Sequence, residues 1–126
     1  MAVQNQYLAI TIGPTAQVGA GTAFTWTWTN QLPGRWYIEA ASLVPDEAQT
    51  ANGTNFSAYT LAKNGTTVGS RSYAATNSVA GTPEALTLTE LQREVVQGDE
   101  LTWAKTVGGT GLAGTNRVDL VLRRIA

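Results

Sequence analysis

The chain has 126 residues, of which 43% are apolar and only 13% charged, and 8 Lys+Arg against 9 Asp+Glu give a net charge of -1. This length fits one domain, and the balance of charges argues against both charge-driven disorder and a basic-patch nucleic-acid binder. The chain contains no His and no Cys, which excludes disulfides, thiolate or imidazole metal ligands, Cys nucleophiles and the Ser-His-Asp triad.

Three strands are predicted before residue 45. The first covers Tyr7–Ile12, and the second covers Phe24–Thr29, where aromatic residues alternate strictly with threonines. Such alternation is the strand period, with one face buried and the other wetter. Asn30–Gly34 contains Pro-Gly and predicts a turn, which leads into a third strand at Arg35–Val44.

The middle of the chain predicts a hairpin between two loops. Asp46–Gly53 is polar and small, as is typical of a loop, and Asn55–Lys63 alternates like a strand. Asn64-Gly65 is the strongest hairpin signal in the chain, because a type I′ turn needs positive φ at both central positions. The partner strand is expected at Thr66–Ala75, followed by a loop at Thr76–Pro83.

The last third predicts three more strands. They are expected at Glu84–Thr89, Glu100–Val107 and Asn116–Ile125, with a short helix-like or turn segment at Glu90–Val96 and a glycine-rich loop at Gly108–Gly114. In the final strand Val118, Leu120 and Leu122 should face inward. About eight short strands in one domain indicate an all-β fold, an antiparallel β-sandwich or jelly roll that covers residues 1–126.

Gly109–Gly114 fits the G-x-G-x-x-G string of dinucleotide-binding proteins. That chemistry requires a helix after the loop, whose N-terminus faces the pyrophosphate. Only twelve residues remain, and they alternate like a strand. We therefore interpret the string as a hairpin loop, with Thr110 and Leu112 exposed at its tip.

The tryptophans allow three interpretations. Trp26, Trp28 and Trp36 could form a platform on which the apolar faces of sugars stack. The favoured reading is that Phe24, Trp26 and Trp28 face the core from a central strand, and a subunit interface is a further possibility.

No catalytic, cofactor or metal site is predicted. The acid pairs at 46–47 and 99–100 are sequence neighbours, which point to opposite faces of a strand and form no acid/base couple. Lys63 and Lys105 could act as bases only if desolvated, and the sequence gives no reason to expect that. The loop at residues 46–55 lacks the acidic spacing of calcium loops. An enzyme is therefore not expected.

Targeting signals are also lacking. Met1–Ile12 carries no basic residue, and no apolar run is long enough for a membrane helix. We predict no membrane partner and no nucleic-acid partner.

Several turn and strand motifs occur together in a recognisable order. They are Val44-Pro45-Asp46-Glu47, Asn52-Gly53-Thr54-Asn55-Phe56, Lys63-Asn64-Gly65-Thr66, Gly98-Asp99-Glu100-Leu101-Thr102 and Gly108-Gly109-Thr110-Gly111. In this order, across residues 40–126, the chain resembles head decoration (capsid cement) proteins of tailed phages.

The resemblance implies a non-enzymatic structural protein made in the host cytoplasm and located on the capsid surface of the virion. Its partner would be the major capsid protein of the phage shell, and it would form a homo-oligomer, with a trimer favoured. A tail or fibre component and a carbohydrate-binding β-sandwich are the alternatives.

Contact residues are expected at the N-terminus and in two loops, because exposed loops on a rigid scaffold carry function more often than strands do. These segments are residues 2–7, 46–55 and 108–116. The predicted contacts are Ala2, Val3, Gln4, Tyr7, Asp46, Glu47, Asn52, Asn55, Thr110, Leu112 and Asn116.

Overall fold

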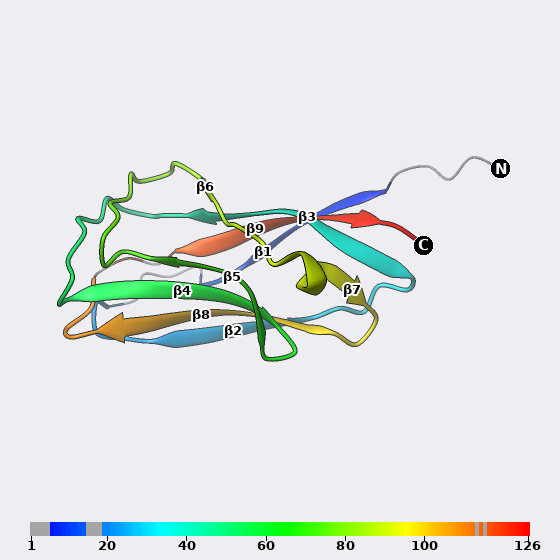
Figure 1. Cartoon of the computed structure of the whole chain (residues 1–126), viewed down its shortest axis with the longest axis horizontal. Helices are drawn as coiled ribbons and strands as arrows, with labels where there is room; N and C mark the ends of the chain where they lie inside the picture. The colour runs from blue at the N-terminus through cyan, green and yellow to red at the C-terminus, as the bar shows by residue number, and fades with distance from the viewer. Residues whose placement is uncertain (1–5, 15–18, 113, 115) are drawn as a thin grey trace.

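The computed structural model describes residues 6–14, 19–112, 114 and 116–126. Two antiparallel sheets pack face to face, which confirms the predicted all-β sandwich (Figure 1). Within the described residues the only helical element is a single 3₁₀ turn, η1 (Glu90–Gln92).

Strand order identifies the sandwich as a jelly roll. One sheet contains β1 (Tyr7–Ile12), β9 (Arg117–Arg124), β3 (Arg35–Val44) and, both paired with β3, β6 (Glu84–Ala85) and β7 (Glu94–Val96). The other contains β2 (Phe24–Thr29), β8 (Glu100–Gly108), β4 (Phe56–Lys63) and β5 (Thr66–Ser72). The first strand pairs with the last and the second with the one before the last, as in a long hairpin that has been rolled up.

The strand at Glu84–Thr89 was predicted too long. Only Glu84 and Ala85 pair with β3, and the segment predicted as helix-like contains η1 followed by β7. The reason lies in tertiary structure, since after β6 the chain crosses to β5, where the Thr89 N–H donates to the Val68 carbonyl at 2.8 Å. The sixth of the eight jelly-roll strands is thus divided into two short pieces along β3.

Aromatic residues of β4 and β8, and one that directly follows β5, form the centre of the core. Tyr59 stacks on Trp103 with ring centroids 5.6 Å apart and meets Tyr73 edge-on at 6.1 Å. From the facing sheet, β9 contributes the buried side chains predicted for it, Val118, Leu120 and Leu122.

The prediction that β2 is a central strand is wrong. β2 is the edge of its sheet and pairs with β8 alone among the described residues. Its aromatics share the inner face with Lys105, Trp103 and Leu101 of β8, but Trp26 keeps 45% of its surface exposed. Alternation indicates which face of a strand is buried, but not whether a further strand covers its side.

Asn64 and Gly65 form the predicted tight hairpin turn between β4 and β5. Their φ angles are 49° and 85°, so both occupy the left-handed region that a type I′ turn requires. The Asn64 side chain also bonds to Asp99 and to the Glu100 N–H, both at 2.9 Å. The hairpin is therefore tied to the turn that precedes β8.

Candidate interaction surface

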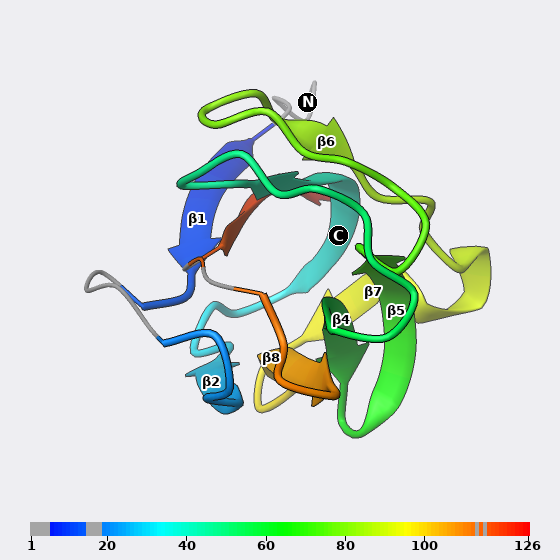
Figure 2. The same cartoon turned by 90° about the vertical axis from the view of Figure 1, so that its left-hand side faces the viewer.

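Four connections gather at one end of the sandwich, which we call the loop end (Figure 2). Their described residues are 13, 14 and 19–23 between β1 and β2, 45–55 between β3 and β4, 73–83 between β5 and β6, and 109–112, 114 and 116 between β8 and β9. Two of the three predicted contact segments, residues 46–55 and 108–116, lie here. The structure adds residues 73–83, of which 73–75 were predicted to continue the preceding strand and 76–83 to form a loop without contacts.

Side-chain bonds join the 45–55 loop and the start of β4 to the β8–β9 connection. The Thr110 N–H donates to Asn55 Oδ1 at 3.0 Å. Ser57 Oγ donates to the Leu112 carbonyl at 3.1 Å and accepts from the Leu112 N–H at 3.0 Å. Leu112 is thereby held by one hydroxyl at both of its backbone groups.

A second set of bonds joins the 45–55 and 73–83 loops. The Gln49 N–H donates to Ser78 Oγ at 2.9 Å, and the Ser78 N–H returns a bond to the Gln49 carbonyl at 2.9 Å. The Ala51 N–H donates to Asn77 Oδ1 at 2.7 Å. Because these bonds already order the loops, little conformational entropy would be lost from them when a partner binds.

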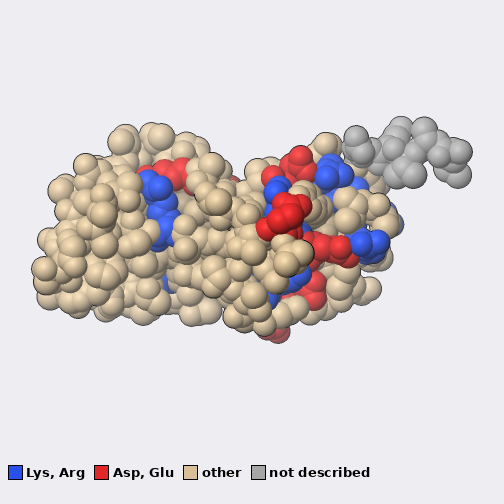
Figure 3. Space-filling model, viewed as in Figure 1, with Lys and Arg blue, Asp and Glu red and all other residues tan. Residues whose placement is uncertain are grey.

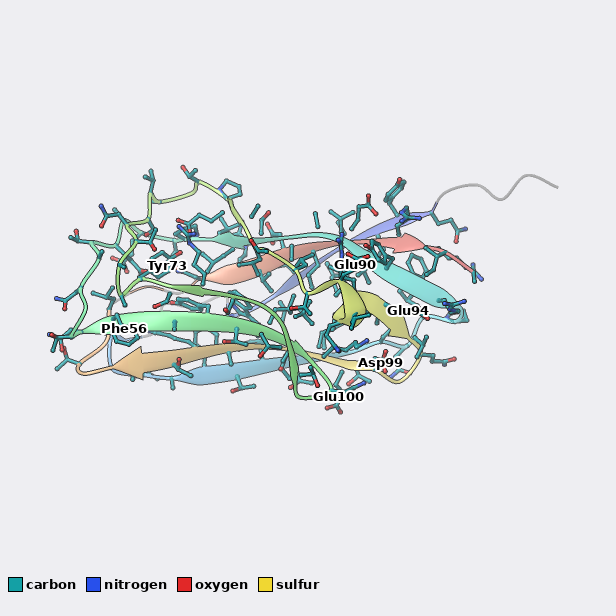
Figure 4. All side chains as sticks on the ribbon, in the orientation of Figure 1. Phe56, Tyr73, Glu90, Glu94, Asp99 and Glu100 are labelled. Carbon is teal, nitrogen blue, oxygen red and sulfur yellow. The ribbon has the colours of Figure 1, made fainter. Side chains whose placement is uncertain are left out.

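The loop end carries few charges. Residues 48–55, 73–83 and 109–112 contain no Asp, Glu, Lys or Arg. Figure 3 shows acidic and basic side chains concentrated on the half of the molecule that bears η1 and β7, and the ion pairs Arg35–Glu94, Arg93–Glu90 and Arg123–Glu39 lie in that region. In Figure 4, Glu90, Glu94, Asp99 and Glu100 lie toward the end opposite Phe56.

Lys105 is buried beneath the loop end, with 1% of its surface exposed. Its Nζ donates to the carbonyls of Gly19 and Leu112, each at 3.2 Å. The amine therefore links the β1–β2 connection to the β8–β9 connection from below.

Burial lowers the pKa of Lys105, and the nearby carboxylates of Asp46 and Glu47 oppose this shift. A lysine with a lowered pKa can act as a base or nucleophile. In this structure, however, the amine is buried and donates hydrogen bonds to two carbonyls, so its contacts stabilise the fold. The expectation that nothing desolvates Lys105 is therefore wrong. Lys105 shares the inner face of β8 with Leu101 and Trp103, and their alternation in the sequence is the signal that could have indicated its burial.

The predicted contacts of the two loops separate into accessible and inaccessible residues. Asp46, Asn52 and Thr110 are exposed, and Glu47 and Asn55 are half-buried. Two predictions are wrong. Asn116 is fully buried, and its backbone carbonyl accepts a bond from Trp103 Nε1 at 2.8 Å. Leu112 is half-buried against the core instead of exposed at a loop tip.

Of the predicted N-terminal contacts, Tyr7 does not join this surface. Tyr7 is 57% exposed but begins β1 at the opposite end of the molecule, near the C-terminus (Figure 1). Ala2, Val3 and Gln4 lie outside the described residues.

Gly109–Gly114 is a connection between sheets and not the predicted hairpin loop, because β8 and β9 belong to different sheets. A strand follows it, so the helix that a dinucleotide site requires does not occur there. Gly111 has φ of 72°, and a side chain at this position would collide with the Ala20 carbonyl. This glycine therefore allows two connections to pack closely.

The three tryptophans considered as a sugar platform do not assemble into one. Trp36 is buried in the other sheet, where its Nε1 donates to the Pro33 carbonyl at 3.0 Å. Trp28 packs against the core, which leaves Trp26 as the exposed ring.

Among the described residues, no group of three or more Asp and Glu side chains is placed to hold a metal ion. That part of the chain also contains no helix of the length and apolar character needed to cross a bilayer. No protein-family model matches the sequence, and no curated protein matches it either.

Proposed function

We propose that this chain is a non-enzymatic structural protein of a phage virion, which binds the outer surface of the assembled capsid through its loop end. The observation that carries the proposal is the combination of rigidity and low charge at that end. The loops are bonded to one another through Asn55, Ser57, Asn77 and Ser78, and Asn52 fixes its own loop by accepting bonds from the Thr54 and Asn55 N–H groups. Apart from Asp46 and Glu47, the described outer residues of these loops are small and polar or apolar. Such a surface offers shape and backbone groups to a partner.

The resemblance of residues 40–126 to decoration proteins supports the same proposal. Jelly rolls are an architecture used by virion proteins, although the fold by itself does not define a function. Many copies on one shell would bind with high avidity even when each contact is weak. Because such a protein binds the assembled shell in preference to free subunits, it would stabilise the assembled state.

Co-sedimentation tests the proposal. Purified chain is mixed with undecorated shells of the phage that encodes it, or with free major capsid protein, and is then sedimented. We expect the chain to pellet with shells and to raise the temperature at which they open. Failure to pellet with shells, or a gene located outside any phage or prophage genome, would contradict the proposal.

A pair of charge-insertion variants tests the loop end itself. Thr110→Arg places a charge on the exposed loop end, and Thr66→Arg places the same charge at the exposed start of β5, at the hairpin away from it. We expect Thr110→Arg to weaken binding to shells about tenfold or more. Burying an unpaired charge in an interface costs more than ~1.4 kcal/mol, which is the free energy of a tenfold change in affinity. Thr66→Arg should bind like the natural chain.

A further inference from the structure

β1 and β2 are edge strands, one in each sheet of the sandwich. Natural sheets protect such edges with charged residues, proline, bulges or a covering segment, because an unpaired ladder recruits another strand. β5, at the far edge of the same sheet as β2, has such protection. It carries Arg71, it contains a register shift against β4 opposite Leu61 and Ala62, and the Thr89 N–H bonds to its Val68 carbonyl.

β2 has none of these devices among the described residues. Its sequence, Phe-Thr-Trp-Thr-Trp-Thr, contains no charge and no proline. Its register with β8 runs without a shift from the Phe24–Lys105 pair to the Thr29–Glu100 pair. Trp26, in the middle of the strand, is 45% exposed. β2 is therefore a regular, uncharged edge with a large apolar side chain left partly open.

The backbone pattern shows which residues of β2 have free hydrogen-bonding groups. The Asn30 N–H donates to the Asp99 carbonyl at 2.8 Å, so Asn30 directs its backbone groups at β8. In an antiparallel ladder this orientation alternates along the strand. The backbone N–H and C=O groups of Phe24, Trp26 and Trp28 accordingly point toward β8. The same groups of Thr25, Thr27 and Thr29 point away from it.

We propose that β2 is the interface between two copies of this chain, which pair edge to edge about a two-fold axis at Thr27. This register pairs Thr27 with its copy and Thr25 with Thr29 of the second copy, so that all three outward-facing residues are hydrogen-bonded. It also keeps the aromatic faces on the same side, with Trp26 directly opposite Trp28 of the second copy.

A second copy fits this edge better than an unrelated strand does, because the edge complements itself. Each residue that offers backbone groups is a threonine that meets a threonine, and each tryptophan meets a tryptophan, while Phe24 lies opposite Asn30, just beyond the strand. A two-fold contact of this kind is closed, so it yields a dimer and leaves no further β2 edge open. The loop end takes no part in the contact, and the inference does not depend on the proposed capsid binding.

Edge β1 supplies the matched control. It is also uncharged and exposes Ala9, but its inner-face residues Leu8 and Ile10 are already packed against the core. Thr27→Lys places two like charges directly opposite each other in the proposed dimer, whereas Ala9→Lys charges the neighbouring edge. Thr27→Pro is a second test, since it removes an N–H that points away from β8.

Sedimentation equilibrium across the micromolar range gives the readout. We expect the natural chain and Ala9→Lys to have twice the 13.3 kDa chain mass at the upper concentrations, and Thr27→Lys and Thr27→Pro to remain at the monomer mass. Far-UV circular dichroism verifies that each variant is folded.

Tryptophan fluorescence gives a reading that does not depend on mass. Dilution of the natural chain should shift its emission to the red as Trp26 is exposed, and Trp26→Phe should lose most of that shift. A natural chain that is monomeric throughout, or an oligomer that survives both Thr27 variants, would overturn the β2 interface. Loss of the dimer in Ala9→Lys alone would assign the contact to β1 instead.

Discussion

Lys105 is the residue whose environment differs most from what its chemistry prefers. A buried ammonium is costly unless it is paired and hydrogen-bonded. Here two carbonyls and the nearby Asp46 and Glu47 provide that compensation. In return for the cost of burial, this one side chain joins the β1–β2 connection to the β8–β9 connection.

The lowered pKa of Lys105 predicts how stability depends on pH. Between the folded-state pKa and the ordinary value of 10.5, the unfolded chain binds more protons, so the free energy of unfolding rises with pH. Lys105→Met lacks this contribution. The stability of the variant relative to the natural chain should therefore fall as pH rises toward 10, by at most about 1.4 kcal/mol per pH unit.

Urea denaturation of both proteins from neutral pH to pH 10 measures that difference. Burial raises the pKa values of Tyr59 and Tyr73, so these groups destabilise both proteins above their unfolded value of 10, and the comparison cancels their effect. A difference that does not vary with pH would show that Lys105 has an ordinary pKa in the folded chain.

Among the elements, the β8–β9 connection shows how a sequence string can mislead. Its glycines fit a nucleotide-binding pattern, but Gly111 serves to let residues 19–21 approach closely. Gly111→Ala should lower the free energy of unfolding by ~2 kcal/mol or more, since it combines a positive φ with a collision against the Ala20 carbonyl.

Gly53→Ala is the control for that prediction. Gly53 lies at the same end of the molecule, its φ is not in the left-handed region, and nothing lies within 4 Å of the position its Cβ would take. Thermal unfolding of the two variants should separate them clearly. Equal melting temperatures would mean that the two connections do not pack as closely as the structure has them.

Strand prediction succeeded where local chemistry decides the outcome. The alternation of β9 and the Asn64-Gly65 turn are local signals, and both are confirmed. Alternation does not show which strands are neighbours in a sheet. For that reason it could not predict that β2 lies at an edge or that one strand is divided into β6 and β7. The burial of Asn116 was missed for the same reason, since Asn116 contacts Trp103 of β8 and the backbone of Asp46, which are distant in sequence.

On the scale of the whole molecule, charge separates the two ends. Arg–Glu pairs stabilise the end with η1 and β7, where exposed pairs each contribute little. Apart from Asp46 and Glu47, the described surface residues of the loop connections are uncharged. Neutral side-chain bonds order most of these connections, together with Lys105 beneath them and the Arg71–Glu84 pair at the adjoining ends of β5 and β6. This separation is the basis for assigning partner binding to the loop end. From the sequence, contacts were predicted in two of its connections but not in the 73–83 connection, although residues 76–83 were predicted to be a loop.

The most direct test is a density map of the native particle of the phage that encodes the chain. We predict additional density on the outer surface of the capsid, into which the sandwich fits with residues 46–55, 73–83 and 109–112 toward the shell. Density for the chain only on the tail or fibres, or a fit with the loop end pointing away from the shell, would contradict the account.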